Sequence, residues 1–164
     1  MTLSQGAIAN RNGKQFEEMC ITLFENHGFE ILTIAKYRKL ENRGELPDKY
    51  VLKNAPFQSI YNHTGKTEFL MVDKTNTQAI RMIRIENKYQ ESAGSVDEKF
   101  PYMLLNAIQA YPENEVILVV DGNGYKPGAR QWLQDRINEN WLDYDKDIKL
   151  MNIMQFVNWL NRGF

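Results

Sequence analysis

An almost unbroken apolar run, EVILVV over residues 115–120, constrains the fold more than any other stretch of this chain. Strands that are apolar on both sides lie in the middle of a sheet whose two faces are covered, usually by helices. The turn residues Asp-Gly-Asn-Gly follow at 121–124, and Pro127 predicts the first turn of a helix that reaches about Asn138. The run therefore predicts an α/β fold with a central strand between two layers of helices.

The rest of the chain supplies elements that suit such a sheet. A helix is predicted at about 12–24, with Gly28 as its stop, and a final helix at about 153–160. Strands are predicted at about 29–34, 58–61, 67–72, 79–89 and 148–151. A further helix toward Ala110 starts either at a capping-box pattern, Ser95 to Glu98, or at Pro101. The order is a helix, strands that end in a three-strand meander, a helix, a strand, a helix, a strand and a helix, which predicts a mixed sheet with helices on both faces.

Between Tyr37 and Pro56 the charges are dense and the apolar periodicity fades. We therefore predict a charged loop or insertion at about 37–56, and loops of this length are often functional. Positive and aromatic side chains occur together there and are candidate substrate contacts: Tyr37, Arg38, Lys39 and Arg43.

Length and composition indicate one globular domain over residues 1–164. Of these residues 43% are hydrophobic and 25% charged, and the net charge of −1 gives no support to a protein that coats nucleic acid. The single cysteine, Cys20, excludes an internal disulfide and a cysteine-cluster metal site. No apolar stretch approaches the roughly 20 residues of a membrane span, and the N-terminus lacks a signal-peptide pattern, so we expect a cytoplasmic protein.

The strand predicted at 79–89 ends with opposite charges, Glu86-Asn87-Lys88. Side chains two apart on a strand share a face, so Glu86 and Lys88 project together, followed by Gln90. A carboxylate can hold Mg²⁺, the cation can polarise a phosphoryl oxygen and activate water, and a lysine can stabilise the developing charge. The simpler interpretation is a solvated ion pair worth less than about 1 kcal/mol.

One carboxylate is too few for magnesium, so a second is expected from the paired strand. A hairpin centred near Asn76-Thr77 places Glu68 opposite Glu86 on the same face. Asp73 would then lie about five rungs, or roughly 17 Å, away, and could serve only if the turn moved to poor turn residues. Asp48 follows Pro47 in the predicted loop, far upstream of these strands, and we do not expect it to bind the metal.

These residues resemble the PD-(D/E)XK nuclease superfamily, and more narrowly its small phage and bacterial members. The resemblance rests on Glu68, seventeen intervening residues, and then Glu86-Asn87-Lys88, within the predicted order of elements. The chain departs from the pattern because Glu68 stands where the family name expects an aspartate after proline. The resemblance implies a restriction-endonuclease-like three-layer α/β/α fold around a central mixed sheet.

The resemblance also implies a divalent-metal-dependent hydrolase that cuts DNA, with Glu68 and Glu86 as ligands of Mg²⁺ or Mn²⁺ and Lys88 assisting the attacking water. By the same resemblance Gln90 continues the catalytic face, and Glu17 on the first helix matches the place of a further glutamate. Endonuclease action and a homodimer are expected by analogy. Candidate DNA contacts are Lys99, Lys126 and Arg130.

Two other functions are consistent with the residues. A catalytically silent module could keep the fold and bind DNA or protein, although the presence of Glu68, Glu86 and Lys88 together argues against it. A nucleotide-binding enzyme could use the glycines near 122–128, but their spacing departs from the dinucleotide pattern and favours an ordinary turn before a helix.

Overall fold

The computed structural model describes residues 5–91 and 93–164, with side chains from residue 13 onward. Its six strands form one sheet in the order β1-β2-β3-β4-β5-β6. The strands are β1 (Glu30–Leu32), β2 (Lys49–Gln58), β3 (Thr64–Asp73), β4 (Arg81–Tyr89), β5 (Glu115–Asp121) and β6 (Asp147–Met151). The β2–β3–β4 meander is antiparallel, whereas β1 is parallel to β2 and the β4–β5–β6 pairs are parallel. The sheet is therefore mixed, as predicted.

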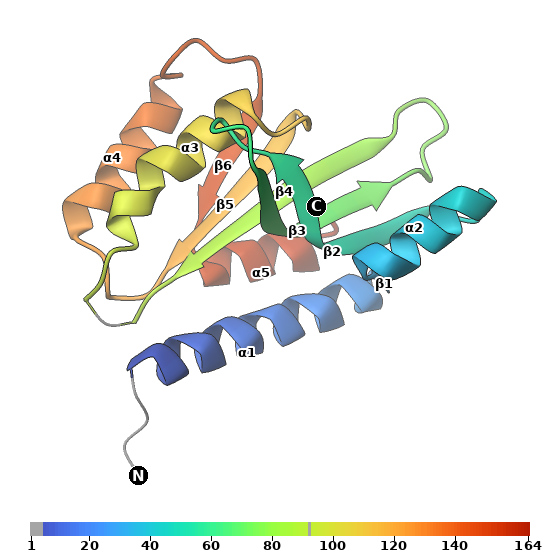
Figure 1. The fold of residues 1–164 in the computed structure, drawn as a ribbon, viewed down its shortest axis with the longest axis horizontal. Helices are drawn as coiled ribbons and strands as arrows, with labels where there is room; N and C mark the ends of the chain where they lie inside the picture. The colour runs from blue at the N-terminus through green and yellow to red at the C-terminus, as the bar shows by residue number, and fades with distance from the viewer. Residues whose placement is uncertain (1–4, 92) are drawn as a thin grey trace.

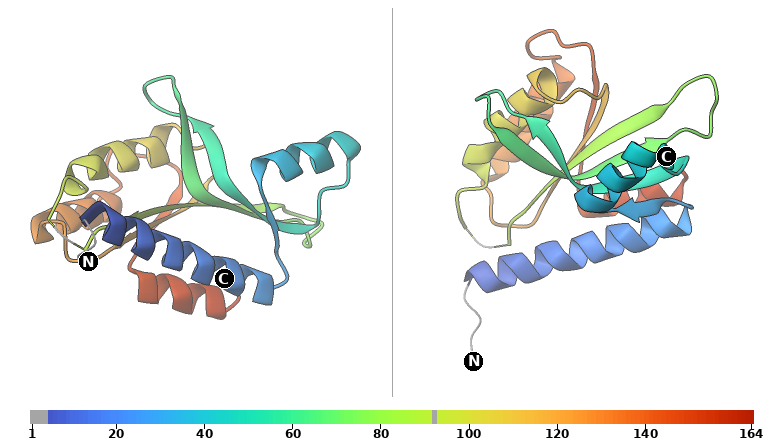
Figure 2. Two further views of the ribbon diagram at one scale, coloured as in Figure 1. Left: turned by 60° about the horizontal axis from the view of Figure 1, so that its bottom comes forward. Right: turned by 45° about the vertical axis from the view of Figure 1, so that its right-hand side comes forward.

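Helices cover both faces of the sheet (Figure 1). They are α1 (Gln5–Asn26), α2 (Ile34–Arg43), a 3₁₀ turn η1 (Asp97–Lys99), α3 (Phe100–Gln109), α4 (Pro127–Asn138) and α5 (Ile153–Asn161). Helices α1 and α5 lie side by side on one face, while α3 and α4 cover β5 and β6 on the other (Figures 1 and 2). None of the helices in the described ranges combines the length and apolar character needed to cross a membrane.

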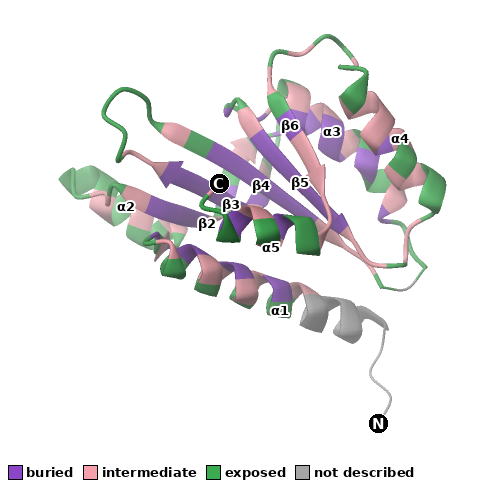
Figure 3. Cartoon of the chain, turned by 180° about the vertical axis from the view of Figure 1, so that it is seen from behind, coloured by how far each residue is buried: buried purple, intermediate pink, exposed green. Residues whose placement is uncertain are grey.

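The core lies on both faces of the central strands (Figure 3). Residues 116–120 of β5 are all buried, as their apolar run predicts. Successive residues alternate between the layers: Ile117 packs in the cluster with α1 and α5, whereas Leu118 packs in the cluster with α3 and α4. The two-sided burial of β5 confirms the predicted α/β architecture.

The predicted loop at 37–56 is wrong, because the segment contains most of α2 and of β2. Thr33 caps α2 by accepting a hydrogen bond from the Lys36 N–H, and Gly44 ends it in the left-handed conformation. No residue of α2 is fully buried. Its narrow apolar face packs partly against the sheet and is hidden in the sequence by the surrounding charges.

Two smaller predictions also need correction. The strand expected at 58–61 is wrong, since β2 ends at Gln58 and the chain turns before β3 begins at Thr64. The capping box at Ser95 is wrong as well, because η1 precedes α3 without a side-chain cap. Pro101 occupies the first turn of α3 and marks the start of this helix, where its missing N–H costs nothing.

The β2–β3 hairpin leaves the plane of the sheet near its middle (Figure 2). Asn54, within β2, has a left-handed φ of 51°, and the β2–β3 ladder has no pair at that position. On the other side of β3, pairing with β4 runs from Asp73↔Arg81 to Phe69↔Ile85 and stops there. The last residues of β4, Glu86 to Tyr89, therefore pair only with β5.

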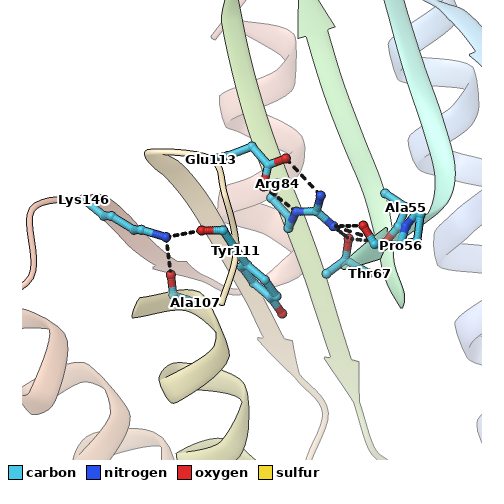
Figure 4. A network of polar contacts seen from close by, with 8 residues as sticks. All are labelled: Ala55, Pro56, Thr67, Arg84, Ala107, Tyr111, Glu113 and Lys146. Carbon is cyan, nitrogen blue, oxygen red and sulfur yellow. Dashed lines mark hydrogen bonds and ion pairs between the residues drawn. The ribbon is translucent and has the colours of Figure 1, made fainter. Parts of the chain in front are cut away.

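Arg84 holds the diverging hairpin in place (Figure 4). Its guanidinium donates to the carbonyl oxygens of Ala55 (3.1 Å) and Pro56 (3.4 Å) and to Thr67 Oγ1 (3.1 Å). The guanidinium also forms a bidentate ion pair with the Glu113 carboxylate, with N···O distances of 2.5 and 2.9 Å, and both side chains are only 3% exposed. The buried pair thus ties β4 to both the hairpin and the segment before β5.

Candidate active site

Glu86 and Lys88 lie on β4 beyond the last rung that it shares with β3. Glu86 is 6% exposed, and the Lys88 ammonium contacts its Oε1 directly. Lys88 Nζ also lies 3.3 Å from the Asn87 carbonyl oxygen. The two side chains share a face, as the strand period predicts, but they are largely buried and are not a solvated surface pair.

Glu68 reaches the same place from β3. The observed β3–β4 register, Asp73↔Arg81 through Phe69↔Ile85, is the one predicted from the turn, and its next rung would place Glu68 opposite Glu86. Because the strands separate there, the Glu68 side chain bridges the gap: its Oε2 accepts a hydrogen bond from the Asn87 N–H at 2.8 Å. A side-chain carboxylate thus takes the place of a backbone acceptor.

The other two carboxylates considered from the sequence lie elsewhere. Asp73 is at the hairpin end of β3, four rungs before the pairing stops, and its Oδ1 accepts hydrogen bonds from the Thr75 N–H and hydroxyl at 2.9 and 2.6 Å. Asp48 is exposed just before β2, and its carbonyl oxygen accepts from the Lys74 N–H beside Asp73. Both therefore lie at the far end of the β3–β4 ladder from Glu86.

The charges at the site strongly affect one another. Burial and then the negative charge of Glu68 together raise the pKa of Glu86 to about 8, against the opposing effect of Lys88. For Lys88, burial lowers the pKa, but the charges of Glu86 and Glu68 outweigh it and the net shift is upward. The site therefore keeps its ammonium and resists holding two carboxylate charges without a further cation.

The residues present fit a hard divalent cation. Glu86 Oε2 is buried and has no hydrogen-bond partner among the described residues, which is costly unless something else satisfies it. Across the side chains that the structure describes, no three His, Cys, Asp or Glu residues are grouped to hold a metal. Two protein carboxylates suit Mg²⁺ or Mn²⁺, which complete their coordination with water and substrate phosphate.

A cavity of about 280 Å³ opens beside these residues. Glu86 and Lys88 form part of its wall, and the rest comes from the β2–β3 hairpin, α3 and the residues next to α3. Lys99, a candidate DNA contact from the sequence, lines this cavity together with Lys66 of β3. Lys126 and Arg130 are not in its lining; Arg130 borders a separate hollow with Gly122 and Tyr125.

Glu17 lies on α1 with a partner of its own. Its carboxylate forms an ion pair with Lys53 of β2 at 2.5 Å. The pKa of the buried Cys20 thiol is raised to about 12, first by burial and then by the charges of Glu17 and Glu68, so both carboxylates lie near this cysteine. The structure therefore brings Glu17 toward the β3 side of the site, but pairs it with Lys53.

Gln90 follows β4 and connects the end of this strand to the end of β5 and the loop that leads to α4. Its N–H donates to the Asp121 carbonyl oxygen at 3.1 Å, and its own carbonyl accepts from the Gly124 N–H at 2.7 Å. A Cβ at Gly122 would lie 2.1 Å from the Gln90 carbonyl oxygen, and Gly122 has a φ of 98°, so this close approach requires glycine. A catalytic role for Gln90 stays a prediction.

Three aromatic residues at the cavity were not singled out from the sequence: Phe57, Tyr102 and Tyr111. The sequence around Phe57 favours a loop and a short strand, so no pattern indicates the hairpin as a wall of the site. Tyr102 lies in α3 and Tyr111 follows this helix, whose apolar spacing indicates core packing rather than a site. Only the way the hairpin folds back onto α3 brings these rings beside Glu86.

A family model described as a PD-(D/E)XK nuclease superfamily domain matches residues 8–164. The chain therefore belongs to the PD-(D/E)XK nuclease superfamily, and its mixed sheet between helical layers has the fold of that class. Members of this superfamily are generally nucleases that use divalent metals. No curated protein and no solved structure matches the chain.

Proposed function

We propose that this protein is a Mg²⁺- or Mn²⁺-dependent nuclease that hydrolyses DNA phosphodiester bonds. The observation that carries the proposal is the meeting of Glu68 and Glu86 beside the Lys88 ammonium, with one buried Glu86 oxygen lacking a partner. Two carboxylates so close together need a cation, and family membership makes a phosphodiester the natural substrate.

Each side chain has a distinct part in this proposal. Glu68 and Glu86 would hold the cation, which when bound supplies a Lewis acid for the phosphoryl oxygen and lowers the pKa of a coordinated water. Lys88 keeps a positive charge at the site and would stabilise negative charge that develops on the phosphoryl oxygens. Because Glu86 is buried, these electrostatic interactions act with little screening by water.

The test is a cleavage assay with supercoiled, linear, single-stranded and four-way-junction DNA, in Mg²⁺, in Mn²⁺ or in chelator. We expect cutting with metal and none in chelator. Nicking of the supercoiled circle would establish endonuclease action. Glu86→Ala and Lys88→Ala should each lower the rate by about 10²-fold or more, whereas substitution of Lys149, a partly exposed lysine on β6, by alanine should not.

Metal binding can be measured separately from cutting by titrating Mn²⁺ and following its electron paramagnetic resonance signal. Wild type should bind Mn²⁺, and Glu68→Ala and Glu86→Ala should weaken binding. Cutting that survives both Glu86→Ala and Lys88→Ala would refute the assignment of the site. A gel shift without any cutting would instead favour a nuclease-fold module that only binds DNA.

We also propose, from the resemblance, that the enzyme acts as a homodimer with one site for each strand. Light scattering coupled to size-exclusion chromatography tests this, with and without a DNA duplex. A monomer in both conditions would remove this part of the proposal and leave the chemistry of the site unaffected.

A further inference from the structure

Three rings stand nearly parallel at the tip of the β2–β3 hairpin and on the adjoining α3. The ring of Tyr61 stacks on Tyr102 with centroids 5.1 Å apart and planes 25° apart. The ring of His63 lies 6.2 Å from Tyr61 with planes 17° apart. We call Tyr61, His63 and Tyr102 the ring stack. Tyr61 is 70% exposed, the highest value among the exposed large apolar residues of the described chain.

The turn that carries Tyr61 is held firmly, so the exposure of its ring does not come from a loose loop. Ser59 and His63 close the turn through the Ser59 N–H to the His63 carbonyl (2.9 Å) and through Ser59 Oγ with His63 Nδ1 (2.9 Å). Asn106, buried in α3, accepts from the Ile60 N–H at 3.0 Å through its Oδ1. Asn106 also donates from its side chain to the Tyr102 carbonyl at 3.0 Å, which ties the turn to the helix turn that bears Tyr102.

The ring stack adjoins the proposed catalytic centre. His63 and Tyr102 line the same 280 Å³ cavity as Glu86 and Lys88. Lys66 and Lys99 also line it, and both are exposed. Among the described residues that line the cavity, Glu86 alone carries a carboxylate, and it contacts Lys88. The cavity lining therefore combines two rings of the ring stack with lysine ammonium groups and with Glu86, one of the two proposed metal ligands.

A single-stranded nucleic acid matches this arrangement. A nucleobase offers a flat face that stacks on tyrosine or histidine, and the adjoining phosphates carry the charge that lysines attract. Bases of an intact duplex are already stacked on each other, so their faces are not free for the rings. Rings that are held in place before binding lose little conformational freedom when a base stacks on them.

We propose that the ring stack receives an unpaired nucleobase of the substrate strand, while Lys66 and Lys99 hold phosphates that lead to the catalytic centre. This inference rests on the proposed nuclease function and narrows its substrate to single strands, or to the unpaired ends and junctions of duplexes. Tyr61 and Tyr102 are then specificity residues that act through the base, and they take no part in the hydrolysis itself.

The test measures binding in chelator, where no cutting occurs, by the fluorescence anisotropy of labelled oligonucleotides. The ligands are a 15-residue thymidine strand, an abasic strand of the same length and charge, and a blunt duplex. Wild type should bind the thymidine strand most tightly. Tyr61→Ala should weaken this binding about 5- to 150-fold, the loss expected for one stacked base, and should leave affinity for the abasic strand unchanged.

Matched variants separate stacking from other effects. Tyr61→Phe keeps the ring and should bind like wild type, and so should Met154→Ala, which removes an exposed apolar side chain from α5. Equal affinity of wild type for the thymidine and abasic strands would overturn the inference, as would wild-type binding by Tyr61→Ala. If cutting nevertheless depends on Lys88, the proposed function stands without the ring stack. Base-dependent binding without any cutting would support the ring stack and count against the nuclease proposal.

Discussion

The Asn87 N–H donates a hydrogen bond to the Glu68 carboxylate at 2.8 Å, at the point where β3 and β4 part. In a continued ladder, the partners of Asn87 would come from the backbone of β3. Here a side chain bridges the gap, so the same carboxylate holds β4 in place and faces Glu86. The separation of the two strands therefore does not leave this β4 amide unpaired, and the carboxylate that accepts from it is one of the two proposed metal ligands.

This double use of Glu68 predicts that its two roles can be separated. Glu68→Gln keeps an oxygen acceptor for the Asn87 N–H but removes the charge, so it should weaken Mn²⁺ binding while amide exchange at Asn87 stays slow. Glu68→Ala removes both, and exchange at Asn87 should become faster, because a hydrogen-bonded amide is protected until its bond opens. Amide hydrogen exchange followed by NMR measures this difference. Fast exchange in the glutamine variant would contradict the role of the carboxylate as acceptor.

The pKa of Glu86 predicts how stability of the metal-free protein depends on pH. Burial, then the charge of Glu68, raises this pKa from about 4.5 to about 8 in the folded state. Between these values the folded protein holds a proton that the unfolded chain has lost, so the contribution of Glu86 to stability falls as pH rises. Glu86→Gln stays neutral and should therefore stabilise the metal-free protein at pH 8 but not at pH 4.5.

Thermal unfolding in chelator at several pH values measures this effect. The melting temperature of wild type relative to Glu86→Gln should fall steadily between about pH 4.5 and 8. Glu25→Gln, an exposed glutamate on α1, is the control and should show no such trend. Adding Mn²⁺ at pH 8 should stabilise wild type and leave Glu86→Gln nearly unchanged. A melting difference that does not vary with pH would contradict the raised pKa.

The buried pair of Arg84 and Glu113 is predicted to be essential for the hairpin. Arg84→Met leaves the Glu113 carboxylate buried without its partner and should lower the free energy of unfolding by about 3–5 kcal/mol. The double variant Arg84→Met with Glu113→Leu removes both charges and should regain part of that loss. Urea denaturation followed by circular dichroism provides the values.

A more exposed ion pair, whose arginine also lies on β4, serves as the control. Arg81 and Glu115 also form a bidentate ion pair, with N···O distances of 3.0 and 2.9 Å, but their side chains are 37% and 29% exposed. Arg81→Met should therefore cost clearly less than Arg84→Met, because water can solvate the glutamate that remains. Equal losses at the two sites would show that burial is not what makes the Arg84 pair strong.

Much of the site follows from the sequence because strand geometry is local. Glu86 and Lys88 share a face through the two-residue period of a strand, and the turn residues near Asn76 set the register that brings Glu68 toward Glu86. The apolar run of β5 likewise determined the layered architecture. Helix α2 was not expected because dense charges surround its few apolar residues, although Ile34, Tyr37 and Leu40 recur every three residues and pack against the sheet.

The sequence by itself determined which side chains share a strand face and which strand lies in the middle of the sheet, because these depend on neighbours along the chain. Only the tertiary structure decided that Glu86 is buried, that the hairpin turns away from β4, and that Tyr61 meets Tyr102. The reason is that these features depend on contacts between distant segments, such as Arg84 with Glu113, 29 residues apart. No local pattern of residues specifies where such segments meet.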